Sequence, residues 1–172
     1  MAITVGTDTY ITVAEADTYI ASWYISTDTQ RVAWTALATA DKEVLLRNAT
    51  EALEQLKFIG AKYDSAQTLS FPRGYYQGQE YYRLYDDYVS DGTVPDEIKN
   101  AQAEEAIELA SPTASTDAAE IRNGYVKSYS IGKLSETYRL SDPTGNGLLT
   151  IIKSLKAQRI LLRYLSGGFE IV

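Results

Sequence analysis

The sequence of 172 residues contains neither cysteine nor histidine. Without cysteine, the chain can form no disulfide framework, no thiolate nucleophile and no cysteine-based metal site. Without histidine, it lacks the commonest general base and the usual zinc ligand, so only carboxylates, lysine and tyrosine remain for chemistry. We therefore expect no catalytic residues, no metal site and no cofactor, and a protein that is not an enzyme.

Long apolar runs are also missing from the sequence. No stretch approaches the roughly 20 apolar residues that a membrane span requires, so we expect no membrane partner. Residues 1–10 have neither a basic start nor an apolar core, and we expect no signal peptide. Because 172 residues can bury one core, we interpret residues 1–172 as a single domain.

Positive charge is scarce, and the formal net charge is −7. This charge repels phosphate over most of the surface, so nucleic-acid binding would require a segregated basic patch.

The most regular apolar pattern lies between residues 39 and 56. Its apolar positions fall on one helical stripe: Leu45, Ala49, Ala52, Leu53 and Leu56. Thr39 is placed to cap the first free N–H groups, and Gly60 follows soon after the last apolar position. We predict an amphipathic helix around which the rest of the chain packs.

An earlier helix is predicted from Thr12, because Thr12 and Glu15 have the spacing of a capping box. Residues 1–11, which precede it, favour an extended arm or short strand. The polar residues after Ile25 mark the end of this helix, and we expect Trp34 and Leu37 to anchor the loop that follows. Its predicted buried face comprises Val13, Ala16, Ile20, Trp23 and Tyr24.

A third helix is predicted to run from Pro95 to Ala110. Pro95 suits the first helical position, and Asp96 and Glu97 suit the positive end of the helix dipole. Its predicted buried face comprises Ile98, Ala101, Ala106, Ile107 and Leu109. The carboxylates Glu104, Glu105 and Glu108 are expected to lie on its solvated face.

Two segments with period-two alternation, 126–131 and 134–140, flank Gly132 and Lys133. This pattern predicts a β-hairpin. Because a two-stranded hairpin alone is marginal in water, we expect it to pack on the helices or to extend into a sheet with strands of neighbouring subunits.

The C-terminal region, residues 147–172, is predicted to be a helix over 148–165 followed by a tail. An apolar arc wide enough to face another subunit comprises Leu148, Ile151, Ile152, Leu155, Leu161, Leu162 and Leu165. A basic stripe comprises Lys153, Lys156, Arg159 and Arg163. The stripe is either a candidate nucleic-acid surface or a solvated face beside an acidic neighbour.

Residues 75–92 form a tyrosine-rich insertion that also carries Glu80, Asp86, Asp87 and Asp91. Its tyrosines are Tyr75, Tyr76, Tyr81, Tyr82, Tyr85 and Tyr88. Such a set suits a protein interface, and the alternative is a long loop laid over the domain with its tyrosines half-buried. The acidic residues argue against a platform for stacking bases.

The segment before this insertion contains Leu69 and Phe71, which we expect to fill the core. Arg73 is interpreted either as a contact to a partner or phosphate, or as an arginine paired with nearby carboxylates. Together, these patterns predict a mainly α fold of about four helices with an added β-hairpin and extended terminal arms.

The order of these motifs resembles the head-tail connector, or adaptor, proteins of tailed bacteriophages, often labelled DnaT-like single-stranded DNA-binding proteins. The resemblance covers most of the chain. It rests on the residues Tyr10–Tyr19, Trp34 and Leu37, Leu46–Thr50, Phe71–Pro72–Arg73, Val94–Ala101, Val126–Ser128 and Ile131–Leu134. The tyrosine-rich insertion departs from the family pattern, as does Phe71, where tryptophan would be common.

This resemblance implies that the helices form a helical bundle with an added β-hairpin. It also implies a structural virion protein without catalytic residues. Such a protein is made in the host cytoplasm and assembles in the neck as a ring, of twelve copies, beneath the portal. The ring completes the head, extends the DNA channel and attaches the stopper or tail-completion protein, while DNA passes through without sequence-specific binding.

Under this interpretation two surfaces are candidate interfaces. The tyrosines listed above would face a neighbouring subunit or the tail. The surface toward the portal or a neighbouring subunit would comprise Ile151, Leu155, Lys156, Arg159, Leu162, Arg163, Phe169 and Ile171. The alternative function is single-stranded DNA binding through the basic stripe. A hydrolase using carboxylates would need a close pair that the sequence does not reveal.

Overall fold

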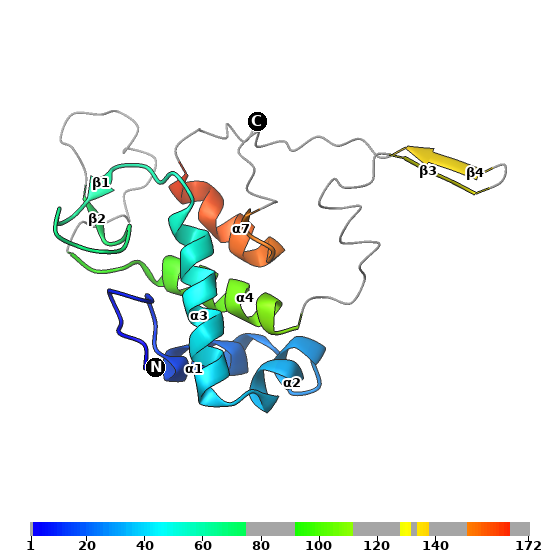
Figure 1. Ribbon diagram of the computed structural model, residues 1–172, viewed down its shortest axis with the longest axis horizontal. Helices are drawn as coiled ribbons and strands as arrows, with labels where there is room; N and C mark the ends of the chain where they lie inside the picture. The colour runs from blue at the N-terminus through cyan, green and yellow to red at the C-terminus, as the bar shows by residue number, and fades with distance from the viewer. Residues whose placement is uncertain (1, 75–91, 112–127, 132–133, 138–150, 166–172) are drawn as a thin grey trace.

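The computed structural model describes residues 2–74, 92–111, 128–131, 134–137 and 151–165 (Figure 1). The described chain is mainly helical, and its helices pack as a bundle. The α-helices are α1 (Val13–Trp23), α2 (Thr29–Ala36), α3 (Thr39–Glu54), α4 (Asp96–Ala110) and α7 (Leu155–Leu161), with the 3₁₀ helix η2 over Leu162–Tyr164. The predicted fold class is confirmed.

Helix α1 begins as its sequence predicts. The Thr12 hydroxyl accepts a hydrogen bond from Glu15 N at 3.1 Å, and the Glu15 carboxylate accepts one from Thr12 N at 2.7 Å. Ala16 and Ile20 are buried, whereas Trp23, which was predicted to be buried, is 68% exposed. The capping box is confirmed, and the predicted buried face is wrong at Trp23 but right at Tyr24, which is buried.

Helix α2 is an element that the apolar pattern did not predict. Trp34 is fully buried as expected, but it lies within this helix and not in a loop. The Asp28 side chain caps the helix by accepting a hydrogen bond from Gln30 N at 2.9 Å. An aspartate before a short polar stretch is therefore the signal that sequence analysis missed.

Helix α3 lies where predicted, but its details differ. The N-cap is Ala38, without a side-chain cap bond, and Thr39 is the first helical residue and does not cap. Leu46, Ala49, Thr50 and Leu53 are buried, whereas Leu45 is only half-buried. Ala49 and Leu53 are therefore buried as predicted, and the buried face extends toward Leu46 and Thr50 in place of Leu45.

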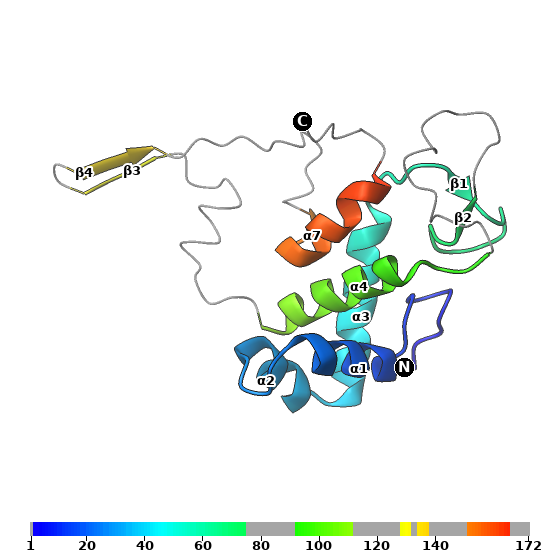
Figure 2. The ribbon, with the colours of Figure 1, turned by 180° about the vertical axis from the view of Figure 1, so that it is seen from behind.

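Helix α4, rather than α3, is the element around which the bundle packs. It contacts α1, α2, α3 and α7. Figures 1 and 2 show α3 crossing it on one face and α7 lying against it from another. Four alanines on α4 let its neighbours approach closely. They are Ala101, Ala103, Ala106 and Ala110.

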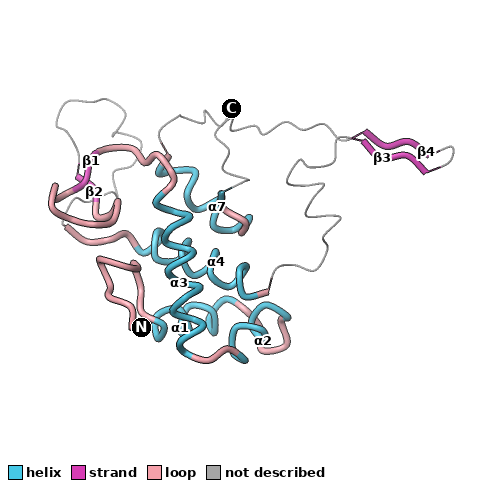
Figure 3. The backbone as a smooth tube through the Cα atoms, viewed as in Figure 1, coloured by secondary structure: helices cyan, strands magenta, loops and turns pink. Residues whose placement is uncertain are grey.

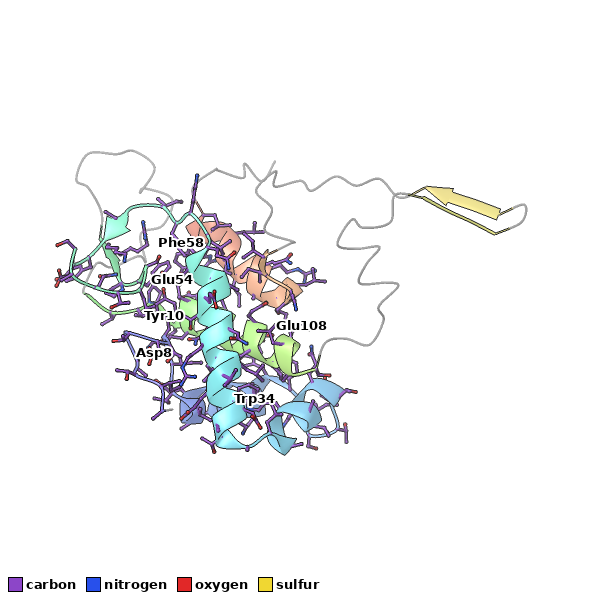
Figure 4. The ribbon with its side chains drawn as sticks, in the orientation of Figure 1. Asp8, Tyr10, Trp34, Glu54, Phe58 and Glu108 are labelled. Atoms are coloured by element: carbon purple, nitrogen blue, oxygen red, sulfur yellow. The ribbon has the colours of Figure 1, made fainter. Side chains whose placement is uncertain are left out.

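Two apolar clusters meet along α3 and α4. One lies at the C-terminal end of α3 and contains Leu53, Phe58, Leu69, Phe71 and Ile98, among others. The other surrounds Trp34, beside α1 and α2. Figure 4 shows Phe58 and Trp34 near opposite ends of α3. The prediction that Leu69 and Phe71 fill the core is confirmed.

The N-terminal segment folds back on itself before it reaches the core. Gly6 N donates to Thr9 O at 2.7 Å, and the following Thr9, Tyr10 and Ile11 are buried. The Tyr10 hydroxyl donates a hydrogen bond to the Glu54 carboxylate, and Figure 4 shows the two residues next to each other. The predicted extended arm is therefore a turn pinned to the bundle.

Strands are few and short in the described residues. β1 (Ala61–Lys62) pairs antiparallel with β2 (Arg73–Gly74) in the segment between α3 and α4 (Figure 3). β3 (Ser128–Ile131) pairs antiparallel with β4 (Leu134–Thr137), with Ile131 opposite Leu134. This pairing confirms the predicted hairpin. Figure 1 shows the hairpin apart from the helices, so it does not pack on them as one alternative expected.

Candidate interface

The predicted C-terminal helix is interrupted, and this interruption decides which of its residues face outward. Residues Ile152–Ser154 leave helical geometry before α7 begins. Ser154 caps α7 by accepting a hydrogen bond from Ala157 N at 3.3 Å, and Gln158 Nε2 donates to Ile152 O at 2.6 Å. The apolar residues on the two sides of the break therefore do not form one continuous arc.

Glu105 on α4 is the reason that the break is stable. Its carboxylate accepts hydrogen bonds from Lys153 N at 3.0 Å and Ser154 N at 2.8 Å. Burial raises the pKa of Glu105, against the opposing effect of these two N–H groups. Both Glu104 and Glu105 are 1% exposed, so their predicted position on a solvated face is wrong.

Most of the predicted apolar arc lies inside the protein's own core. Ile152, Leu161 and Leu165 are buried, and the half-buried Ile151 and Leu162 pack against the same cluster. Leu155 is 44% exposed. Among the predicted apolar interface residues that the structure describes, only Leu155 is therefore largely available to another subunit.

The four basic residues of the predicted stripe are all exposed, but two of them have carboxylate partners. Lys156 Nζ lies 3.7 Å from Glu104 Oε1, and Arg163 lies 3.6 Å from Glu97 Oε1. Lys153 and Arg159, the other two residues of the stripe, lie on either side of Lys156 in the sequence. The interpretation as a solvated face beside an acidic neighbour thus applies to Lys156 and Arg163.

The buried Glu104 of α4 contacts side chains from both the α1 region and α7. It accepts hydrogen bonds from the hydroxyls of Tyr19 at 2.8 Å and Tyr24 at 2.5 Å, both from the α1 region. Lys156 of α7 also lies over the Tyr24 ring, 3.9 Å from its centroid. Burial, and then the hydrogen bond to Glu104, raise the pKa of both tyrosines.

Arg73 makes its described contacts to backbone carbonyls and aromatic rings of the core. Its guanidinium donates to backbone carbonyls of Ile59 at 2.7 Å and Gly60 at 2.5 Å. It also lies over the rings of Phe58 and Phe71, each 5.9 Å from the centroid. Arg73 therefore holds the turn after α3 against the core.

The remaining predicted interface residues lie outside the described residues. They are Tyr75, Tyr76, Tyr81, Tyr82, Tyr85 and Tyr88 of the insertion, and Phe169 and Ile171 of the tail.

The structure reveals exposed apolar residues that sequence analysis did not select. Ile25 is 72% exposed and Val32 is 51% exposed, in addition to Trp23. Trp23 and Ile25 flank the buried Tyr24 at the end of α1. Two apolar residues flanking Tyr24 could have indicated an exposed apolar surface, but the helical pattern assigned Trp23 to the buried face.

A pocket of about 170 Å³ opens between the N-terminal turns of α1 and α4. Glu15, Asp96 and Lys99 line it, and Lys99 Nζ lies 3.3 Å from Asp96 Oδ1. Within the described residues, no three carboxylates cluster as a metal site would require. None of the helices described there is long and apolar enough to cross a membrane.

Comparison with known proteins identifies one family that matches this chain. A family model described as "Putative DnaT-like ssDNA binding protein" matches residues 2–169. Neither a curated protein nor a solved structure matches the chain. The match covers the bundle, the hairpin and the insertion together.

Proposed function

The chain belongs to the family described as "Putative DnaT-like ssDNA binding protein", and from this premise we propose that it is a head-tail connector of a tailed bacteriophage. In this role it is a structural, non-catalytic virion protein. Copies assemble as a ring, of twelve subunits, beneath the portal in the neck. The ring extends the DNA channel and attaches the stopper or tail.

The observation that best supports this proposal is the β3–β4 hairpin. Its two strands pair with each other over Ser128–Ile131 and Leu134–Thr137, and Figure 1 shows them apart from the helices. An isolated two-stranded hairpin is marginal in water, and its outer edges can accept further strands. Strands from neighbouring copies would complete such a sheet around a ring.

The charge of the chain is consistent with a channel component. The formal net charge of −7 gives a surface that repels phosphate. A negative channel wall lets DNA slide without adhering. The exposed Trp23, Ile25 and Leu155 supply apolar surface for contacts between proteins.

Light scattering of the purified protein, alone and mixed with the portal protein of its phage, tests the proposal. We expect a complex in which several copies join one portal ring. If the protein neither forms rings by itself nor binds the portal, the connector function is excluded.

The second candidate function is the single-stranded DNA binding named in the family description. The exposed Lys153 and Arg159 favour it, because they are basic, close in sequence and separate from the carboxylates that hold Lys156 and Arg163. Phosphate binding through these residues would release counterions, so the affinity would fall steeply with salt.

The double variant Lys153→Gln and Arg159→Gln tests this candidate. If the two side chains neutralise two phosphates, the slope of log K against log salt falls by about 1.4 in the variant. Lys99→Gln is the control, since Lys99 is paired with Asp96 on α4 and its loss should leave the slope unchanged. Absent or salt-independent binding by the wild-type protein excludes this function.

A further inference from the structure

The end of α1 and the start of α7 form a surface that we call the α1–α7 junction, made of Trp23, Tyr24, Ile25, Leu155 and Lys156. Tyr24 and Lys156 join the two elements, since Lys156 Nζ lies 3.9 Å from the Tyr24 ring centroid. Next to these two residues in the chain stand Trp23, 68% exposed, Ile25, 72% exposed, and Leu155, 44% exposed. Three large apolar side chains are thus exposed beside one cation–π contact.

The fold itself does not require these apolar side chains. Neither apolar cluster of the core includes Trp23, Ile25 or Leu155. Trp23 lies beside the Tyr19 ring, with the centroids 6.0 Å apart, and most of its surface is exposed. A tryptophan exposed near other apolar groups is typical of a binding hot spot.

The exposed charged side chains around Leu155 are basic, although Lys156 also lies 3.7 Å from the buried Glu104. Lys156 is 53% exposed at its side chain, and Lys153 and Arg159 on either side of it are exposed. A partner that fits this surface would therefore combine aromatic or apolar groups with negative charge.

The chain itself contains a segment of that composition. Residues 75–91 include six tyrosines and the carboxylates Glu80, Asp86, Asp87 and Asp91, against the one basic residue Arg83. We propose that the α1–α7 junction binds the tyrosine-rich segment of a second copy. This inference rests on the proposed ring and identifies one of its subunit contacts.

The position of the segment's ends favours a second copy over the same copy. The segment follows β2 at Gly74, and it ends before Gly92, which lies against the Tyr63 ring in the same region. Figures 1 and 2 place β1–β2 and the α1–α2 corner at opposite ends of the bundle. A contact between opposite ends is heterologous, and repeated around a closed rotation it generates a ring.

Cross-linking between introduced cysteines tests the proposal, because the chain has no cysteine of its own. Ser26→Cys places a thiol next to Ile25 at an exposed position, and Ser90→Cys places one in the tyrosine-rich segment. Both substitutions leave the aromatic residues intact. The two variants are mixed in equal amounts, assembled alone or on the portal, and treated with a short bismaleimide.

We expect a covalent dimer that forms only when both variants are present. Adding Trp23→Ala to the Ser26→Cys chain should reduce this product at least tenfold. The control pairs Ser90→Cys with Asn48→Cys and should give little product, since Asn48 is exposed on α3, a helix that contributes no residue to the junction. The melting temperature of each variant shows that it is folded.

The other outcomes separate the inference from the proposed function. If rings form and the dimer does not, the junction contact is wrong and the ring stands. If one chain carrying both cysteines cross-links to itself as a monomer, the second copy is excluded. If no assembly forms under any condition, the connector function fails, and the junction contact fails with it.

Discussion

At the scale of single residues, two buried glutamates on α4 determine how the bundle is connected. Glu104 accepts hydrogen bonds from Tyr19 and Tyr24 and lies 3.7 Å from Lys156, whereas Glu105 accepts two from backbone N–H groups. Moving a carboxylate out of water costs several kcal/mol unless hydrogen bonds and opposite charges compensate. Each glutamate is therefore stable only with its partners on α1 or α7 in place.

The substitution Glu104→Ala should destabilise the protein by about 3–5 kcal/mol, because it leaves two tyrosine hydroxyls and a lysine without their shared acceptor. Chemical denaturation measures this loss. Glu51→Ala is the matched control, since Glu51 is exposed on α3 and its loss should change the free energy of unfolding by less than about 0.5 kcal/mol. Similar losses for the two variants would contradict the buried network.

The burial of these two glutamates could not be predicted from the sequence. Glutamate in a helix with apolar neighbours is normally solvated, and the spacing of Glu104, Glu105 and Glu108 gives no sign of burial. Their burial follows from the packing of α1 and α7 against α4, which is a tertiary property. The groups that compensate for this burial, two tyrosine hydroxyls and two backbone N–H groups, lie far away in the sequence.

At the scale of elements, α7 shows how a side chain can end and restart a helix. The apolar period predicts one helix over 148–165, but Ser154 caps a new helix and Glu105 binds the two N–H groups exposed by the break. Such a cap is worth about 1 kcal/mol. An isolated segment would have no Glu105 to hold it in this geometry.

Ser154→Ala should therefore reduce the free energy of unfolding by about 1 kcal/mol, since the Ala157 N–H loses its side-chain acceptor. Ser22→Ala is the control, because the Ser22 hydroxyl bonds the Thr18 carbonyl on an exposed helix face. Loss of this hydroxyl should lower the free energy of unfolding by less than about 0.5 kcal/mol, as is usual for a substitution on the surface. Equal effects in urea denaturation would show that Ser154 does not act as a cap.

The contact between Glu105 and α7 also predicts a pH dependence. Burial raises the pKa of Glu105 above its ordinary value of 4.5, so the native state holds the proton more tightly than the unfolded state. Its contribution to stability is fully present below pH 4.5 and is lost as pH rises through the folded-state pKa.

Glu105→Gln removes this titration. The free energy of unfolding of the wild-type protein should fall, relative to that of the variant, as pH rises above 4.5 through the folded-state pKa of Glu105. Denaturant titrations of both proteins at several pH values measure the difference. A difference that stays constant with pH, or that changes with the opposite sign, would contradict the raised pKa.

The elements that the sequence predicts correctly have local signals. The capping box of Thr12 and Glu15, the acidic first turn of α4 and the alternation around Gly132 each depend on neighbouring residues. The short helix α2 was missed because its sequence TQRVAWTA is largely polar and carries one buried anchor, Trp34. The exposure of Trp23 was missed because helical spacing alone does not show where a helix leaves the core.

At the scale of the whole molecule, the predicted interface on the C-terminal region stays a prediction. The structure shows that Leu155, Lys156, Arg159 and Arg163 are exposed. Ile151 and Leu162 pack inward because the break in the helix turns the two apolar segments toward the same cluster. Without the arrangement of α4 and α7, the width of an apolar arc cannot distinguish a core from an interface.

The separation of hairpin and bundle suggests that folding and assembly depend on different parts of the chain. Replacing residues 128–137 with a short Gly-Ser linker removes both strands of the hairpin. Because Figure 1 shows the hairpin apart from the helices, the melting temperature should change by less than about 2 °C, which corresponds to under 1 kcal/mol for a chain of this size.

Ring formation, in contrast, should be lost in the linker variant, because the strand edges that would join neighbouring copies are gone. Light scattering with the portal protein measures this effect. Leu69→Ala is the opposite control: its buried side chain supports the core, so the melting temperature should fall while the hairpin stays intact. A linker variant that melts early would place the hairpin in the folding unit, and one that still forms rings would exclude strand pairing as the bond between subunits.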